Sequence, residues 1–170
     1  MLALSKKKEQ FMKINIIAVG HLKEKYLKEA IAEYSKRLTR YCDLEIIEVD
    51  DEQAPENLSH AQGLQVKKRE AEKMLKKFKQ GSTLIALDLK GEQPTSEGFA
   101  AKLDSFMVSG ASNLTFIIGG SLGIDDELIG MADYRLCMSK MTFPHQLARL
   151  ILLEQLYRGF KILAGEPYHK

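Results

Sequence analysis

Short apolar runs alternate with longer amphipathic stretches along almost the whole chain. The runs at about 12–20, 44–49, 82–89, 114–118 and 134–138 predict strands, and the stretches at about 23–41, 64–79, 96–109 and 143–164 predict helices, with a short helix after Asp125. Most of these strand runs are apolar at nearly every position, which is typical of parallel strands covered on both faces. The pattern therefore predicts an α/β fold with a mostly parallel sheet covered by helices on both faces.

The last predicted helix, at about 143–164, is apolar on nearly all sides. Thr142 or Phe143 can cap it, Pro144 suits its first turn, and Gly165 with Pro167 marks its end. Such a helix needs cover on more than one side. We expect its inner face to pack on the sheet and its outer face on a second copy, giving a homodimer. The alternative is a central core helix of a monomer.

The chain of 170 residues, 45% apolar and 28% charged, has the size of one globular domain. Because the strand pattern begins at Met12, we expect residues 1–11 to form an appendage, mostly disordered, and residues 12–170 to form a single domain. No uncharged run has the length of a membrane span, and the apolar start is too short for a signal peptide. Cys42 and Cys137 lack metal or redox spacing. We therefore expect a cytoplasmic protein with no metal and no membrane association.

The net charge is only +2, but its distribution is uneven. Residues 43–56 hold seven acids and no base, whereas residues 65–79 hold seven bases and two acids. From Lys140 to the end, five bases face two acids. Such clusters are commonly solvated faces, and some mark an anion or nucleic-acid surface.

Ligands of parallel sheets bind beyond the carboxyl ends of the strands, here residues 87–91, 119–123 and 138–143. The glycine loop at 119–123 lacks the patterns of dinucleotide and nucleoside triphosphate sites. It is either a tight turn or a place where a ligand approaches the backbone closely. At 138–143, backbone N–H groups beside Met138, Met141 and Phe143 suit a flat heteroaromatic ring better than a free phosphate.

The glycine loop also matches G-x-S-x-G, the nucleophile elbow of serine hydrolases, with Ser121 as the nucleophile. Asp133 with His145 or His169 would supply the acid and the base. Asp125 and the acid after it oppose this reading, because they place negative charge where an oxyanion would develop.

Several motifs together resemble one known family. They are the start Met12-Lys-Ile, the run Ile118-Gly-Gly-Ser-Leu-Gly, the segment Ser139-Lys-Met-Thr-Phe-Pro-His-Gln-Leu-Ala-Arg, the run Glu154-Gln-Leu-Tyr-Arg and the terminal Pro-Tyr-His-Lys. They resemble the ribosomal RNA large subunit methyltransferase H family, small SPOUT-class enzymes that methylate N3 of a pseudouridine in 23S rRNA. The resemblance extends from Met12 to Lys170. It implies a C-terminal trefoil knot, a homodimer and S-adenosylmethionine as the methyl donor.

The resemblance also implies roles for particular residues. The cofactor-binding residues would be Leu87, Gly119, Met138, Ser139, Lys140, Met141, Thr142 and Phe143. The catalytic, substrate-side residues would be Arg158, Tyr168, His169 and Lys170, completed by the partner subunit. Lys170 replaces an arginine of some relatives, which keeps the cation but not the bidentate fork.

Elementary chemistry suggests what these residues would do. The imidazole of His169 can accept the N3 proton at neutral pH, and Arg158 or Lys170 would favour the developing uracil anion. Tyr168 would stack on the base. Since the net charge is weak, we expect poor binding to free rRNA and a need for the large subunit or the assembled ribosome. A non-catalytic ribosome-binding factor is a rival hypothesis, and it predicts no saturable binding of S-adenosylmethionine.

Overall fold

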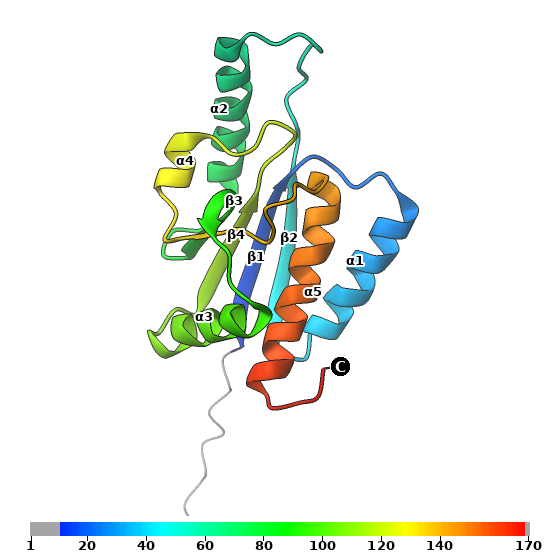
Figure 1. Cartoon of the computed structure of the whole chain (residues 1–170), viewed down its shortest axis with the longest axis vertical. Coiled ribbons are helices and arrows are strands. Elements are labelled where there is room, and N and C mark those ends of the chain that lie inside the picture. Colours follow the sequence, from blue (N-terminus) through cyan, green and yellow to red (C-terminus); the bar gives the residue numbers. More distant parts are fainter. Residues whose placement is uncertain (1–10, 169–170) are drawn as a thin grey trace, which may run out of the picture.

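The computed structural model describes residues 11–168, so residues 1–10 of the expected appendage at 1–11 and the tail residues His169 and Lys170 lie outside the described residues. Strands and helices alternate along the chain (Figure 1). Their order is β1 (Met12–Val19), α1 (Lys25–Leu38), β2 (Cys42–Val49), α2 (His60–Lys77), β3 (Thr83–Glu92), α3 (Ser96–Val108), β4 (Asn113–Ile118), α4 (Asp126–Gly130), β5 (Tyr134–Leu136) and α5 (His145–Leu163).

The five strands form one sheet in the order β2-β1-β4-β3-β5, and every neighbouring pair is parallel. This confirms the predicted parallel α/β fold. Because all strands run the same way, their carboxyl ends meet at one edge of the sheet. The knot implied by the resemblance stays a prediction.

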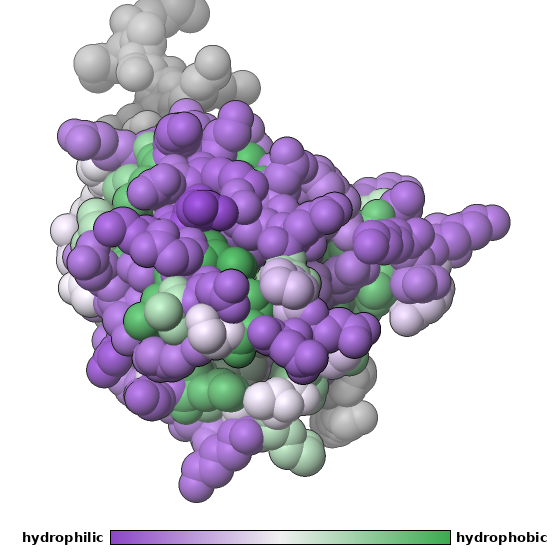
Figure 2. Space-filling model, turned by 90° about the horizontal axis from the view of Figure 1, so that it is seen from above, coloured by the Kyte–Doolittle hydropathy of each residue, from purple (hydrophilic) through white to green (hydrophobic). Residues whose placement is uncertain are grey.

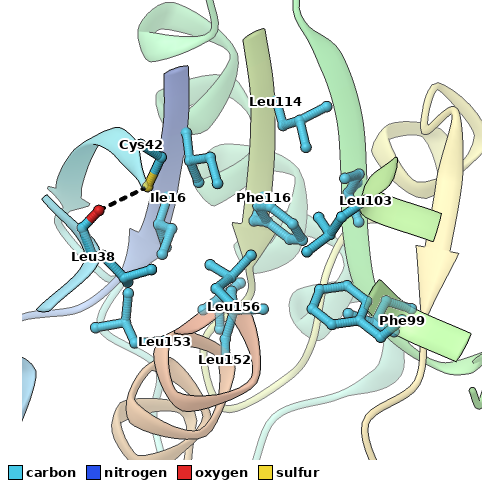
Figure 3. Packing of buried hydrophobic residues seen from close by; sticks show 14 of the residues in the cluster. Ile16, Leu38, Cys42, Phe99, Leu103, Leu114, Phe116, Leu152, Leu153 and Leu156 are labelled. Atoms are coloured by element: carbon cyan, nitrogen blue, oxygen red, sulfur yellow. Dashed lines mark hydrogen bonds between the residues drawn. The ribbon is translucent and has the colours of Figure 1, made fainter. Parts of the chain in front are cut away.

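Helices cover both faces of the sheet (Figure 1). On one face α1, α3 and α5 bury the larger core, where Phe116 of β4 lies among Leu103 of α3 and Leu152 and Leu156 of α5 (Figure 3). On the other face α2 and α4 pack a smaller cluster that includes Met74 and Leu128. Successive residues of each strand point to opposite faces. The strands β1, β3 and β4 therefore supply both cores, which explains their nearly continuous apolar runs.

Two helix starts differ from the sequence-based expectation. Pro144 is the N-cap of α5 rather than part of its first turn, and neither Thr142 nor Phe143 caps the helix. The helix α2 starts at His60 instead of about residue 64, because Ser59 and Gln62 form a capping box across its first turn. Within residues 11–168, no helix is long and apolar enough to cross a membrane.

Candidate functional site

A cavity of about 320 Å³ opens at the carboxyl edge of the sheet, where the three predicted loops meet. Its walls come from the end of β3, from the glycine loop after β4, from the segment after β5 and from the first turn of α5. Figure 2 looks onto this edge and shows apolar areas set among polar residues. The structure thus brings together segments that are spread over more than fifty residues of the chain, as expected from the parallel strand order.

The glycine loop takes a shape that side chains would prevent. A Cβ on Gly119 would lie 2.6 Å from the carbonyl carbon of Gly123, and Gly123 has a φ of 86°. The N–H of Gly123 donates to the carbonyl of Gly120 at 3.0 Å and closes the turn. The loop therefore lets a ligand approach its backbone closely.

The segment after β5 forms the apolar wall of the cavity. Its Met138, Ser139, Met141, Thr142 and Phe143 line the cavity, as do Leu87 and Gly119 of the other two loops. The hydroxyl of Ser139 accepts a hydrogen bond from the N–H of Met141 at 3.0 Å, which fixes the turn. Lys140 is exposed and does not line the cavity. Seven of the eight residues expected to bind a cofactor therefore lie around one space, and their binding role stays a prediction.

His145 closes the cavity at the start of α5 and is half-buried. Burial and the nearby charge of Arg149 lower its pKa, so its imidazole is neutral at pH 7. A Cβ on Gly20, at the end of β1, would lie 3.3 Å from His145 Nε2. The end of β1 therefore lies directly against this imidazole.

Arg149, one turn further along α5, anchors the helix to the sheet. Its side chain is 1% exposed and donates to the carbonyls of Val19 and Gly20 at the end of β1. It also donates to Glu48 Oε2 of β2 at 2.8 Å, and the same oxygen accepts from the N–H of Leu22. Burial opposes ionisation of Glu48, but these two hydrogen bonds outweigh it and lower its pKa. The position of the first turn of α5 thus depends on one buried guanidinium.

Glu70 of α2 lies behind the glycine loop. It is 4% exposed, and its Oε1 accepts from the N–H of Glu52 at 3.1 Å. Its Oε2 is buried and has no hydrogen-bond partner within the described part of the chain. A Cβ on Gly120 would lie 3.2 Å from Oε2, so a single glycine separates this carboxylate from the cavity. Burial raises the pKa of Glu70.

The predicted substrate-side residues form a second cluster near the end of α5. Glu154 Oε1 accepts from Arg158 at 2.6 Å and from the hydroxyl of Tyr168 at 2.9 Å. The Arg158 guanidinium carbon lies 4.3 Å from the centre of the Tyr168 ring, and Tyr157 packs edge-on against that ring. Burial and the bond to Glu154 raise the pKa of the Tyr168 hydroxyl, so it stays protonated.

The second cluster is remote from the cavity in the same chain. Arg158 follows His145 by thirteen residues of one continuous helix, which corresponds to about 20 Å. One copy of the chain therefore does not bring Arg158 and Tyr168 to its own cavity.

The hydrolase alternative has no geometric support. The carboxylate of Asp133 accepts from the N–H of Leu84 at 2.8 Å, at the amino-terminal ends of β5 and β3. It thus faces away from the edge that carries Ser121 and His145. Within residues 11–168, no three His, Cys, Asp or Glu side chains form a group that could hold a metal ion.

The sequence patterns alone indicate no role for Arg149 or Glu70. Arg149 belongs to the quoted motif of α5, but its chain spacing does not show that it reaches β1 and β2. Glu70 left a weak signal, because it falls on the buried face of α2 together with Val66 and Met74. An acid in line with apolar residues at helical spacing indicates a buried carboxylate.

The comparisons with known proteins match the whole described domain. A family model described as "Predicted SPOUT methyltransferase" matches residues 12–169. Proteins called "Ribosomal RNA large subunit methyltransferase H" from Ruminiclostridium cellulolyticum and Acetivibrio thermocellus are 68% and 65% identical, over 94% of this chain and 100% of theirs. A tRNA methyltransferase structure from Aquifex aeolicus is 13% identical with a TM-score of 0.54, covering 93% of this chain and 75% of that one. A probable methyltransferase from Bordetella pertussis is 10% identical with a TM-score of 0.53, covering 89% and 98%. These two structures share the fold.

Proposed function

Because this chain belongs to the SPOUT methyltransferase family, we propose that it transfers a methyl group from S-adenosylmethionine to N3 of a pseudouridine in 23S ribosomal RNA. The names of the two relatives support a substrate in large-subunit ribosomal RNA. The observation that carries the proposal is the single cavity formed by the three loops that the family resemblance assigns to the cofactor.

The cavity fits such a cofactor in size and chemistry. Its volume of about 320 Å³ lies within the range of small-molecule sites, roughly 300–1,000 Å³. Leu87, Met138 and Phe143 offer apolar surface for a flat ring, and the glycine loop offers backbone without side chains. When bound, S-adenosylmethionine supplies a methyl group that its sulfonium already makes electrophilic. The protein therefore needs to hold donor and acceptor in line and to accept one proton.

The tail cluster supplies the groups that suit the acceptor. Methylation at N3 requires loss of the N3 proton, and His169 is our candidate base. Arg158 carries a fixed cation that favours the anion left on the ring. Tyr168 presents an aromatic face beside that cation, which suits a stacked base. Glu154 holds Arg158 and Tyr168 together before any substrate arrives.

A homodimer would bring the two clusters together. The cavity and the Arg158 cluster lie about 20 Å apart on α5 of one chain, so the tail of one copy would act at the cavity of the other. On α5, Ile151 is only half-buried and Leu163 is exposed in the single chain, which leaves apolar surface for a second copy to cover.

The proposal is tested by calorimetry with S-adenosylmethionine, followed by methylation of ribosomes that lack the modification. We expect saturable binding and transfer of one methyl group to N3 of a 23S rRNA pseudouridine. The assembled ribosome should be methylated faster than a naked RNA hairpin. Absence of saturable binding would favour a non-catalytic ribosome-binding factor.

The two-chain site is tested by mixing two inactive variants. Gly119→Val fills the glycine loop, and Arg158→Ala removes the substrate-side cation. A mixed dimer would contain one site with both parts intact, so mixing should restore methylation. If each site were built from a single chain, the mixture would stay inactive.

A further inference from the structure

The carboxylate of Glu70 is placed unusually for a surface helix. Its residue is 4% exposed, and Oε2 has no hydrogen-bond partner within residues 11–168. The charged groups that act on it are Asp51 and Glu52 from the loop after β2, and Lys73 on α2. Lys73 is itself bound to Glu52 at 2.8 Å. The negative charge of Glu70 is therefore only partly compensated.

Only Gly120 stands between this carboxylate and the cavity. Oε2 lies 3.2 Å from the point where a Cβ of residue 120 would be, and Val19 Cγ1 lies 3.1 Å from the same point. Gly120 itself lines the cavity. Because Glu70 is buried, the field of its carboxylate is screened less by water and salt than that of a surface acid would be.

The proposed reaction changes the charge of the molecule in the cavity. S-adenosylmethionine carries a sulfonium cation, and its demethylated product S-adenosylhomocysteine carries a neutral thioether. The two molecules are otherwise nearly identical in shape, so apolar contacts and backbone hydrogen bonds cannot separate them strongly. A fixed negative charge beside the cavity attracts the sulfonium cation but not the neutral thioether, so it can discriminate between the two molecules.

We propose that Glu70 is a specificity-determining residue that favours the sulfonium cofactor over its neutral product. The inference rests on the proposed function, because it assumes that this cofactor occupies the cavity. Glu70 acts through its charge and not through contact, with Gly120 as the spacer. After methyl transfer, the neutral product is therefore bound more weakly than the cofactor and dissociates more readily.

Ionisation of Glu70 and binding of the sulfonium cofactor should favour each other. Burial raises the pKa of Glu70, so its carboxylate keeps a proton to higher pH than that of an exposed glutamate. A cation in the cavity favours the ionised form. The preference for S-adenosylmethionine over S-adenosylhomocysteine should therefore increase as pH rises through the range where Glu70 loses its proton.

The test is calorimetry with both ligands on the full chain carrying Glu70→Gln. The amide oxygen can still accept from the N–H of Glu52, so the anchor remains while the charge is lost. We expect S-adenosylmethionine to bind about three- to tenfold more weakly and S-adenosylhomocysteine to change less than about twofold. The matched control is Glu72→Gln, which removes the same charge from an exposed position of α2 and should leave both affinities unchanged.

The outcomes separate the two proposals. If the unaltered chain binds neither ligand, the proposed function fails. If both ligands bind and the affinity ratio is the same in Glu70→Gln, the role of Glu70 is wrong. Should that variant not fold, the affinity ratio of the unaltered chain is measured between pH 5 and 8.5. A ratio independent of pH overturns the inference.

The pH series needs two further variants. His145 also lines the cavity. Its protonation would add a positive charge and weaken binding of the sulfonium at low pH, as protonation of Glu70 would. The series is therefore repeated in His145→Gln. The same series is run in Asp88→Asn, because Asp88 also lines the cavity. A pH dependence that persists in both variants is assigned to Glu70, and one that disappears in either variant belongs to that residue and refutes the inference.

Discussion

Replacing Arg149 by methionine should destabilise the protein more than most single substitutions. Methionine keeps much of the apolar stem but removes the guanidinium, which is bonded to Glu48 and to the carbonyls of Val19 and Gly20. The side chain of Arg149 is 1% exposed, and Glu48 is half-buried. The substitution therefore removes the guanidinium donor from two strand-end carbonyls and leaves Glu48 with the hydrogen bond from the N–H of Leu22.

The size of the effect follows from this geometry. Breaking a buried ion pair by removing one partner costs about 3–5 kcal/mol of folding stability. Because Glu48 is partly exposed, we expect a cost at the lower limit of this range, about 3 kcal/mol. With a urea m-value of about 2 kcal/mol/M, the unfolding midpoint should fall by about 1.5 M. Circular dichroism in urea measures this at one fixed protein concentration, because unfolding of the proposed dimer would depend on concentration.

The matched control is Arg37→Met on α1, where an exposed arginine pairs with Glu33 four residues earlier. This variant should leave the midpoint essentially unchanged. If the free energy of unfolding of Arg149→Met falls by less than about 1 kcal/mol, water replaces the hydrogen bonds that the carbonyls at the end of β1 have lost. The view of Arg149 as the anchor of α5 would then be wrong.

Three further outcomes are expected. Because the pKa of Glu48 is lowered in the folded protein, its contribution to stability is present above the ordinary pKa of 4.5 and is lost as pH falls through the folded value. The free energy of unfolding of Glu48→Gln should therefore decrease less on acidification than that of the unaltered chain. Gly119→Ala should weaken S-adenosylmethionine binding about tenfold or more, whereas Gly130→Ala, with open space at its Cβ, should bind normally in calorimetry. Burial raises the pKa of the Cys42 thiol to about 12, so it should react with Ellman's reagent at pH 8 only after unfolding; rapid reaction in the native protein would contradict its burial.

Hydrophobic periodicity was sufficient to predict the fold, because continuous apolar strand runs separated by helices leave few alternatives to a parallel sheet. The strand order then places the carboxyl ends at one edge, so Leu87, Gly119 and Met138 could be expected to meet. Periodicity does not fix which side chain reaches across the sheet. The roles of Arg149 and Glu70 depend on contacts between α5 and β1 and between α2 and the glycine loop, and these appear only in three dimensions.

The cap of α5 shows a second limit of local reasoning. Pro144 suits either the cap or the first turn of a helix, and its ψ of 136° places it before the first turn. Local preference therefore identified the helix but did not fix its first residue.

The helix α5 joins the cavity to the distant Arg158 cluster as one stiff rod, with His145 at one end and Arg158 towards the other. In a twofold pair, filling one cavity would push on the near end of a rod whose far end serves the opposite cavity. The two catalytic centres would then sense each other's occupancy mechanically, and the second equivalent of cofactor would bind with an affinity different from the first.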